Sequence, residues 1–307
     1  MLKILFSFIL TCSIVSTVQA SLLNEKPAKA TESNSSLDTK IRIRDSHGKW
    51  AFDAPPERIA VINWTITEQL IELGVAPVAI ADLSGFKSTS PQTSFSEQQS
   101  KAVDLGSRFT PDLKTLKALK PEIIMIGYSQ RDLLRPLSNI APVMYFNNFS
   151  RRNDNASKAD ERFLVLAKLF NKVALAQQKL QQRDAEINNL KLQLTNIQNI
   201  PSAFTVASMK QGDLWAYSTN SIPDAVIKKL GLTAELNDKP TKLGTRKLKT
   251  KEISSLNGCL IFINNNPATK NTPHNDRCAY HAESTNTFGG AMSQLYLAQS
   301  IANSILK

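Results

Sequence analysis

The 307-residue sequence predicts an α/β protein of two lobes, each with a parallel sheet, joined by one long helix. Short apolar runs alternate with helical patterns on both sides of the middle of the chain, which is typical of parallel sheets covered by helices. The middle itself, residues 157–200, contains neither Gly nor Pro and has a helical apolar pattern. The length agrees, because it suits two lobes of ordinary size better than one small domain.

The N-terminus has the pattern of an export signal. Lys3 supplies a positive charge, residues 4–18 are apolar and almost uncharged, and Ala20 ends a small-x-small motif. We therefore expect residues 1–20 to be a signal peptide cleaved after Ala20, which places the mature chain in the periplasm. An uncleaved anchor is less favoured, because a membrane span needs about 20 apolar residues. A lipoprotein modified at Cys12 is also less favoured, because the apolar run continues past that residue.

The charge balance is basic, with 37 Lys and Arg against 26 Asp and Glu. Such a balance can indicate nucleic acid, anionic membranes or anionic ligands as partners. No stretch resembles a nucleic-acid-binding module, so we interpret the charge as a solvated basic surface and expect no nucleic-acid partner. The sequence also lacks G-x-S-x-G, phosphate-loop, H-E-x-x-H and paired C-x-x-C motifs, so we do not expect an enzyme.

Residues 21–56 are predicted to be a flexible leader. Their first part is polar and rich in Ser, Lys and Ala, and it has no apolar pattern that could join a core. Within this range, residues 41–52 alternate weakly between apolar and polar side chains, so they could form a hairpin at an edge.

Residues 57–156 are predicted to form the first lobe. The run 123–126 is continuously apolar, which is typical of a strand buried on both faces. Thr65 is the predicted N-cap of the first helix, and Gly74 its C-terminal stop. The expected strands are 59–62, 75–81, 123–126 and 143–146, and the expected helices are 68–73, 111–119 and 132–140.

The helical segment 157–200 is predicted to contain a stiff helix at 173–197 that joins the lobes. At 1.5 Å per residue this helix would be about 37 Å long, more than a helix that only covers a sheet needs. A coiled coil is the alternative, but the apolar stripe is too short and irregular for repeated heptads. Residues 201–307 are predicted to form the second lobe, with strands at 204–208, 214–217 and 260–263 and helices at 222–230 and 289–306.

Two Cys remain after removal of the signal, Cys259 and Cys278. In an oxidising compartment an isolated pair often forms a disulfide, but the sequence does not show whether the two meet in space. His274, Cys278 and His281 could supply ligands to Zn²⁺. Their surroundings are polar and Asn-rich, so we interpret this segment as a surface loop and expect no metal site.

Several motifs together resemble a known family. They are Arg58–Trp64 with Glu68–Asp82, Asp104-Leu-Gly106-Ser-Arg108, Pro111-Asp-Leu113, Leu119-Lys-Pro121-Glu-Ile-Ile and Phe288-Gly-Gly-Ala-Met-Ser. Over residues 57–307 the chain resembles the periplasmic binding proteins for iron siderophores and cobalamin, with the ferric hydroxamate-binding branch as the nearest likeness. The resemblance implies two Rossmann-like lobes with a ligand cleft between them.

The resemblance also implies a function. It implies a periplasmic solute-binding protein of an ABC importer, which binds a ferric siderophore of the hydroxamate type and delivers it to an inner-membrane permease. Iron would enter only as part of the siderophore, so no cofactor is expected, and we expect a monomer. Arg108 and Tyr128 match residues that contact iron-bound hydroxamate oxygens, and a guanidinium can donate to two such oxygens at once. Trp64, Trp215 and Phe288 are candidates for aromatic walls of the cleft, with core positions as the alternative.

The sequence departs from the family pattern in three places. Members usually present an acid on each lobe to Arg residues of the permease, but here Lys114 and Lys228 match those positions. Asp112 and Asp224 lie close by as alternative docking acids. Leu243 stands where the family has a Trp, and the stretch between Phe262 and Phe288 is short for the family, which implies a trimmed second lobe. The two Lys keep open the hypothesis of a periplasmic interaction protein that has lost transport, and a cobalamin or haem carrier is the other alternative.

Overall fold

The computed structural model of the protein describes residues 40–90, 93–147, 149–263, 278–283 and 285–307. The predicted signal peptide, the first part of the predicted leader and His274 lie outside these ranges. Among the described residues, no helix is both long and apolar enough to cross a membrane.

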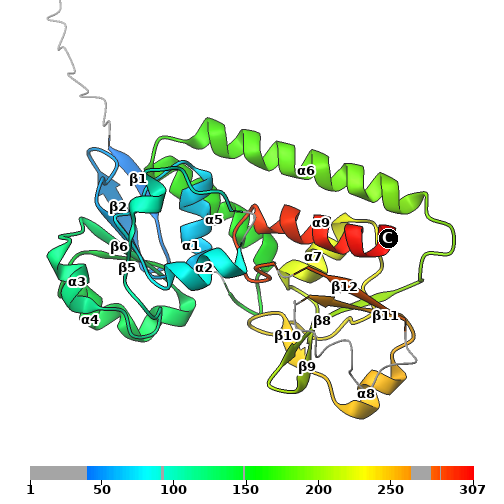
Figure 1. Cartoon of the computed structure of the whole chain (residues 1–307). Coiled ribbons are helices and arrows are strands. Elements are labelled where there is room, and N and C mark those ends of the chain that lie inside the picture. The colour runs from blue at the N-terminus through cyan, green and yellow to red at the C-terminus, as the bar shows by residue number, and fades with distance from the viewer. Residues whose placement is uncertain (1–39, 91–92, 148, 264–277, 284) are drawn as a thin grey trace, which may run out of the picture. The chain divides into compact units, whose positions relative to one another are not determined.

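The first lobe is built on a five-stranded sheet of order β5-β4-β3-β6-β7 (Figure 1), in which every strand is parallel to its neighbours. Helical connections between successive strands return the chain across the sheet, as parallel pairing requires. The strands are β3 (Ile59–Val61), β4 (Ala79–Ile80), β5 (Val103–Asp104), β6 (Ile123–Gly127) and β7 (Val143–Phe146). The helices are α1 (Trp64–Glu72), α2 (Leu83–Thr89), α3 (Leu113–Ala118) and α4 (Leu134–Ser138), with 3-10 turns η1 (Gln99–Lys101) and η2 (Tyr128–Leu133).

Apolar side chains cover both faces of this sheet. Along β6, Ile123 and Met125 pack with α1 and with α5 (Asn155–Leu169), whereas Ile124 and Ile126 pack with α3 and α4. Every residue of β6 is buried, because both of its faces are covered. The prediction of a strand buried on both faces is therefore confirmed.

The first helix is capped by Asn63 and not by Thr65, so that part of the prediction is wrong. The side-chain oxygen of Asn63 accepts from the N–H groups of Thr65 and Ile66 at 3.0 and 3.2 Å. An Asn just before the helix reaches these free N–H groups and is among the strongest caps. The Thr65 hydroxyl instead donates to the carbonyl of Phe288, in the second lobe, at 2.9 Å.

Residues 41–52 form the hairpin that the alternation indicated, with strands β1 (Ile41–Arg44) and β2 (Lys49–Phe52). Its inner face joins the first-lobe core, where Ile43 is buried and Trp50 is partly buried. The side chain of Asp45 accepts from the N–H of Tyr145 on β7 at 2.9 Å. The leader boundary at residue 56 is therefore corrected, because the hairpin packs as part of the first lobe.

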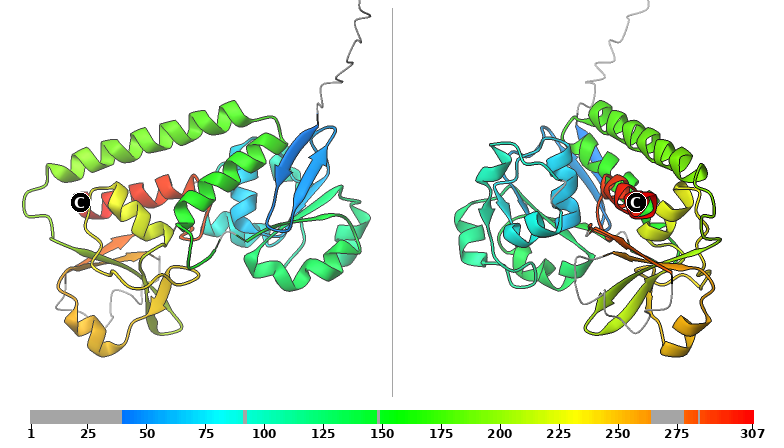
Figure 2. Two further views of the ribbon diagram at one scale, coloured as in Figure 1. Left: turned by 180° about the vertical axis from the view of Figure 1, so that it is seen from behind. Right: turned by 45° about the vertical axis from the view of Figure 1, so that its right-hand side comes forward.

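The long helix is present as α6 (Val173–Thr195), a single helix of 23 residues that ends two residues before the predicted position. Figures 1 and 2 show α6 alongside α9 (Ser293–Leu306), the last helix of the chain. Ala176 of α6 belongs to the first-lobe core, whereas Ile187 and Leu194 belong to the second-lobe core. One helix thus contributes to both cores, as a helix that joins two lobes should.

The second lobe has a mixed sheet of order β10-β9-β8-β11-β12. β8, β11 and β12 are parallel, whereas β9 and β10 are antiparallel to their neighbours. The antiparallel pair β8–β9 differs from the expected parallel sheet because Gln211 and Gly212, with φ of 52° and 82°, make a two-residue hairpin turn. The elements are β8 (Phe204–Lys210), β9 (Asp213–Tyr217), α7 (Ile222–Lys229), β10 (Thr245–Lys247), α8 (Thr250–Ser255), β11 (Cys259–Ile263) and β12 (Ala279–Ala282).

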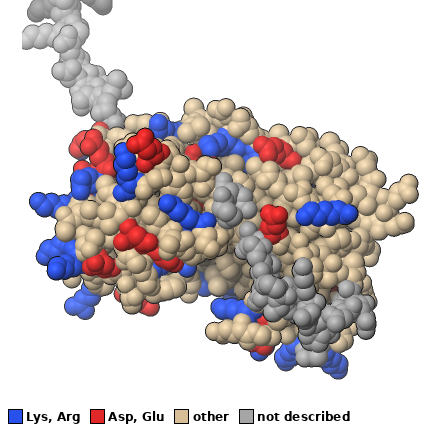
Figure 3. All heavy atoms as spheres, in the orientation of Figure 1, with Lys and Arg blue, Asp and Glu red and all other residues tan. Residues whose placement is uncertain are grey.

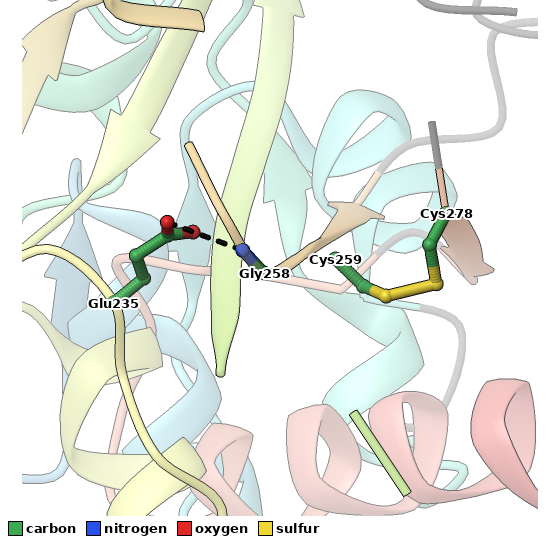
Figure 4. Close-up of a disulfide and its surroundings, with 4 residues drawn as sticks. All are labelled: Glu235, Gly258, Cys259 and Cys278. Carbon is green, nitrogen blue, oxygen red and sulfur yellow. Dashed lines mark hydrogen bonds between the residues drawn. A yellow bond between two sulfur atoms is a disulfide. The ribbon is translucent and has the colours of Figure 1, made fainter. Parts of the chain in front are cut away.

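A disulfide joins Cys259 to Cys278, the pairing that the sequence left open (Figure 4). Cys259 begins β11, and Cys278 directly precedes β12. The two strands are parallel neighbours, so their first residues lie side by side, with 4.8 Å between the two Cα atoms. The bridge thus fastens β12, the edge strand, to its neighbour β11.

Candidate binding site

A cavity of about 360 Å³ lies between the two lobes. Its first-lobe wall comes mainly from loops that follow β3, β5, β6 and β7, at the carboxyl edge where open α/β sheets bind ligands. Its second-lobe wall comes from the loop before β10 and from the segment between β12 and α9. The lining residues are Asn63, Trp64, Thr65, Thr89, Arg108, Ser129, Phe149, Leu243, Thr285, Asn286, Thr287 and Phe288.

Arg108 lies on the loop after β5 and is held by two first-lobe neighbours. Its guanidinium carbon is 3.3 Å from the centroid of the Trp64 ring, a cation–π contact. Its Nε donates to Oδ2 of Asp82 at 3.2 Å. No described residue accepts from its Nη1 or Nη2. Burial lowers the pKa of Arg108 and Asp82 opposes that shift, but a guanidinium stays charged at neutral pH.

Asp82 is a residue of the site that the sequence analysis missed. It follows β4 with φ of 54°, a left-handed conformation that Asp tolerates, and its N–H donates to the carbonyl of Gly106 at 2.6 Å. Its own carbonyl accepts from Nε1 of Trp64 at 3.1 Å. Asp82 thus positions both the Trp64 ring and the Arg108 guanidinium. The available signal was an acid directly after a predicted strand, at the sheet edge expected for Arg108.

Tyr128 begins η2 directly after β6 and is partly buried. It does not line the cavity itself, but the next residue, Ser129, does. The ammonium of Lys242, which comes from the second lobe, lies 3.5 Å from the centroid of the Tyr128 ring. Tyr128 therefore stands at the border of the cavity, where the two lobes contact each other. Sequence reasoning did not identify Lys242, because only the fold brings it to Tyr128.

Phe288 contributes an aromatic wall from the second lobe. Its ring centroid lies 6.1 Å from that of Phe149 and 6.0 Å from that of Tyr217. The Tyr217 hydroxyl is in turn 2.8 Å from the hydroxyl of Thr287. Trp215 lies two residues earlier on β9, beside Lys210, and does not line the cavity. The structure thus brings Trp64, Arg108 and Phe288 together and leaves Trp215 outside.

Behind the cavity, buried polar groups connect the lobes. The Glu68 carboxylate of α1 accepts from the N–H groups of Gly290 and Ser293 at 3.2 and 3.0 Å, and from the Ser293 hydroxyl. Burial raises the pKa of Glu68 to about 7. A Cβ at Gly290 would lie 2.8 Å from the Glu68 carboxylate, so only Gly fits this contact. The residues of two family-like motifs, 68–82 and 288–293, therefore meet at this junction.

Arg162 and Arg183 complete the junction from the helical segment. Arg162 donates to Oε1 of Gln69 at 2.6 Å, and burial lowers its pKa to about 10. Arg183 donates to both carboxylate oxygens of Asp160 at 2.5 and 2.9 Å and to the carbonyl of Ala291 at 3.1 Å. The helices α1, α5, α6 and α9 and the segment before α9 thus share one hydrogen-bonded network.

The residues considered for permease docking differ in exposure. Lys114 and Lys228 are exposed, and Asp112 is exposed as the N-cap of α3. Asp224, expected to be partly exposed, is only 6% exposed and is paired with Lys228 at 2.7 Å. It lies in the first turn of α7, where its backbone N–H donates to the Ser221 side chain, and its own side chain is buried. On the face that Figure 3 shows, basic and acidic side chains are interspersed over the first lobe.

Among the described residues, no three His, Cys, Asp or Glu side chains are grouped so that they could hold a metal ion. Of the segment considered for zinc, Cys278 is in the disulfide, and the His281 ring stacks on Phe262 with 5.4 Å between centroids.

The fold and the cavity define a two-lobed solute-binding protein with its site between the lobes. Residues 59–286 match the family model described as periplasmic binding protein, and the chain belongs to this family. The Fe(3+)-citrate-binding protein YfmC of Bacillus subtilis is 24% identical over 270 residues, which are 87% of this chain and 80% of the relative. The iron(3+)-hydroxamate-binding protein FhuD of Escherichia coli is 26% identical over 136 residues, 44% of this chain and 45% of the relative.

Solved structures show the same fold. The siderophore-binding protein FhuD of Vibrio cholerae, with bound Fe³⁺-Desferal, matches with a TM-score of 0.73 and 31% identity, over 81% of this chain and 98% of that chain. The acinetobactin-binding protein BauB matches with a TM-score of 0.66 at 18% identity, over 86% of this chain and 98% of that chain. The predicted fold class and the predicted family are both confirmed.

Proposed function

We propose that the protein binds a ferric siderophore in the cavity between its lobes and delivers it to the permease of an ABC importer. The single observation that carries this proposal is Arg108. Its Nη1 and Nη2 have no partner among the described residues, and Arg108 lines a cavity at the carboxyl edge of the sheet. Oxygen atoms bound to iron keep partial negative charge, and a guanidinium fork can donate to two of them.

The relatives support this class of ligand. The names of the relatives in Bacillus subtilis and Escherichia coli refer to ferric citrate and to ferric hydroxamate. The 31% identical protein of Vibrio cholerae is described with ferric desferal bound. Within the class, we propose a hydroxamate-type chelate, because Trp64, Phe149 and Phe288 offer aromatic cover to the apolar arms around a compact centre.

The proposal also covers the location of the protein, its oligomeric state and its docking to the permease. We propose that residues 1–20 are removed after Ala20 and that the mature chain acts in the periplasm as a monomer. Iron is cargo and reaches the protein already chelated, so no resident cofactor is part of the proposal. Docking to the permease would use the exposed charges near Lys114 and Lys228.

The test is a fluorescence titration of the mature protein. The Trp64 ring stacks on Arg108, so an iron centre held by Arg108 should quench Trp64 emission. We expect saturable quenching by ferrichrome, less or none by cobalamin, and none by the iron-free siderophore. Trp64→Phe serves as the matched control: it should remove most of the optical signal while calorimetry still detects binding. If no ferric chelate among hydroxamate, citrate and catecholate types binds, the proposal is wrong.

A further inference from the structure

A contact between the lobes borders the cavity and involves a cation with no acidic partner. Lys242 of the second lobe places its ammonium 3.5 Å from the ring centroid of Tyr128 in the first lobe. The residues that follow them, Leu243 and Ser129, line the cavity from opposite sides. Lys242 is partly buried, and no acid among the described residues forms an ion pair with it.

The charges around the cavity are unbalanced. No Asp or Glu lines it among the described residues. Asp82, which holds the lining residue Arg108, is already paired with it at 3.2 Å. Among the described residues, the charge of Lys242 therefore has no counter-charge, and its ammonium contacts the face of the Tyr128 ring.

The loop that carries Lys242 is held in place. Asn220 donates to the carbonyl of Thr241 at 3.0 Å, and also to the carbonyl of Ser150 in the connection between the lobes at 3.0 Å. Gly244 has φ of 70°, and a Cβ there would lie 2.6 Å from Ser221. A loop fixed at both ends holds Lys242 in a defined position at the border of the cavity, next to the lining residue Leu243.

A ligand that uses Tyr128 must first move the ammonium off the ring. A neutral chelate has no ionised group that could bind the displaced ammonium of Lys242, so the lost cation–π contact is not compensated. A chelate with an ionised carboxylate outside its iron centre gives it a charge-assisted hydrogen bond, which is stronger than a neutral one. The same contact therefore penalises one kind of chelate and favours the other.

We propose that Lys242 is a specificity residue that selects ferric chelates carrying a free, ionised carboxylate. The inference rests on the proposed function, since it concerns which ferric chelate the cavity accepts. Arg108 holds the oxygens at the iron centre from the first lobe, and Lys242 holds the peripheral carboxylate from the second lobe. A carboxylate-bearing hydroxamate chelate satisfies both groups.

The test compares two ferric hydroxamates, the neutral ferrichrome and the carboxylate-bearing ferric aerobactin, by calorimetric titration. Wild type should bind ferric aerobactin more tightly. Lys242→Gln should weaken ferric aerobactin about tenfold, the loss expected for one hydrogen bond to a charged group, and leave ferrichrome unchanged or slightly tighter. Lys242→Arg should keep the preference. Lys239→Gln, at an exposed cation in the same connection, is the matched control and should change neither affinity.

The outcomes separate the two levels of the proposal. If wild type binds neither chelate, the proposed function is wrong, and with it the role of Lys242 in selecting the chelate. If both chelates bind and their affinity ratio is the same in wild type and Lys242→Gln, the function stands and the role of Lys242 is wrong. Raising the salt concentration gives a second readout: the affinity for ferric aerobactin should fall more steeply in wild type than in Lys242→Gln.

Discussion

The two lobes contact each other in two regions of opposite character. The first is the interlobe junction, which consists of Glu68, Gln69, Arg162, Arg183, Ser293 and Gln294. All six residues are buried, and each makes at least one hydrogen bond to another element. The second region is the cavity border at Arg108 and the Tyr128–Lys242 contact. Its side chains are partly exposed, and two nitrogens of Arg108 have no partner in the part of the chain that the structure describes.

This difference distinguishes residues that specify how the lobes are arranged from residues that would contact the ligand. A buried charged network is costly to leave incomplete, so it specifies one arrangement of the lobes. Partly exposed polar groups at the cavity are hydrated when no ligand is bound, so leaving one without a protein partner costs less free energy than at the junction. The residue types at the cavity can therefore differ between proteins that bind different ligands. Among the motifs that carry the resemblance, Glu68, Gln69 and the segment 290–293 lie at the junction. They therefore indicate family and fold more sharply than they indicate the ligand.

The largest effect should come from removing a charge at the junction. Arg183 is 2% exposed, and Arg183→Met would remove its two hydrogen bonds to the Asp160 carboxylate, which would keep the one from Gln294, and its hydrogen bond to the Ala291 carbonyl. We expect the free energy of unfolding to fall by about 3–5 kcal/mol, as for other broken buried ion pairs. Urea unfolding measures this loss. Gln182→Met, at the exposed preceding position, is the control, and equal stabilities of the two variants would contradict a network that specifies the junction.

A pH dependence should distinguish the junction from the cavity. The pKa of Glu68 is raised from 4.5 to about 7 by burial, so between these values the folded state holds a proton that the unfolded state has lost. The free energy of unfolding should therefore fall as pH rises through this window, by roughly 3 kcal/mol for this group alone. Urea unfolding at pH 5 and pH 8 measures the difference.

Glu68→Gln should remove that part of the pH dependence, because an amide does not titrate. Glu161→Gln, at an exposed position of α5, should retain it. A difference between pH 5 and pH 8 that is the same in wild type and in Glu68→Gln would show that Glu68 does not titrate in this window.

In the cavity, a substitution should change binding and leave stability nearly unchanged. Arg108→Ala removes the fork that faces the ligand, and we expect ferric hydroxamate binding to weaken by at least about 1.5 kcal/mol. Arg108→Lys should restore little, because an ammonium cannot donate as a fork or stack as a plane on Trp64. Titration with ferrichrome measures both, with Arg135→Ala, at an exposed position of α4, as the control. An unchanged dissociation constant with the fold intact by circular dichroism would exclude Arg108 from the site.

The same contrast explains what the sequence could predict. Continuous apolar runs identified β3, β6, β7 and β11, because burial on both faces leaves no polar position. The edge strands of the second sheet carry no such signal, because β10 (Thr-Arg-Lys) is polar and β12 (Ala-Tyr-His-Ala) is short, with one buried residue. In the cavity, Trp64, Arg108 and Phe288 could be predicted from motifs. Asp82, Phe149 and Lys242 could not, because their roles depend on contacts between segments far apart in the chain.

Docking to the permease should show the smallest effect, and exposure decides which charges contribute to it. Asp224 is buried against Lys228, and the Asp112 carboxylate is engaged by the N–H groups of Lys114 and Thr115 at 3.0 Å each. These acids are held by hydrogen bonds within the protein, whereas both Lys side chains are exposed, with the Lys228 ammonium paired to Asp224. We therefore expect the lysines to dock on a permease that presents acids, and charge of this kind acts mainly on the rate of association.

The experiment is siderophore-dependent growth with paired replacements. Lys114→Glu with Lys228→Glu should slow growth and leave chelate affinity unchanged, since neither Lys lines the cavity. Asp112→Asn with Asp224→Asn should leave uptake intact, with a modest loss of stability because both acids accept hydrogen bonds within the fold. Slow growth only in the Asp pair, at normal stability, would reverse the assignment. Normal growth in both pairs would support a chain that keeps the fold of a binding protein but no longer supplies a permease.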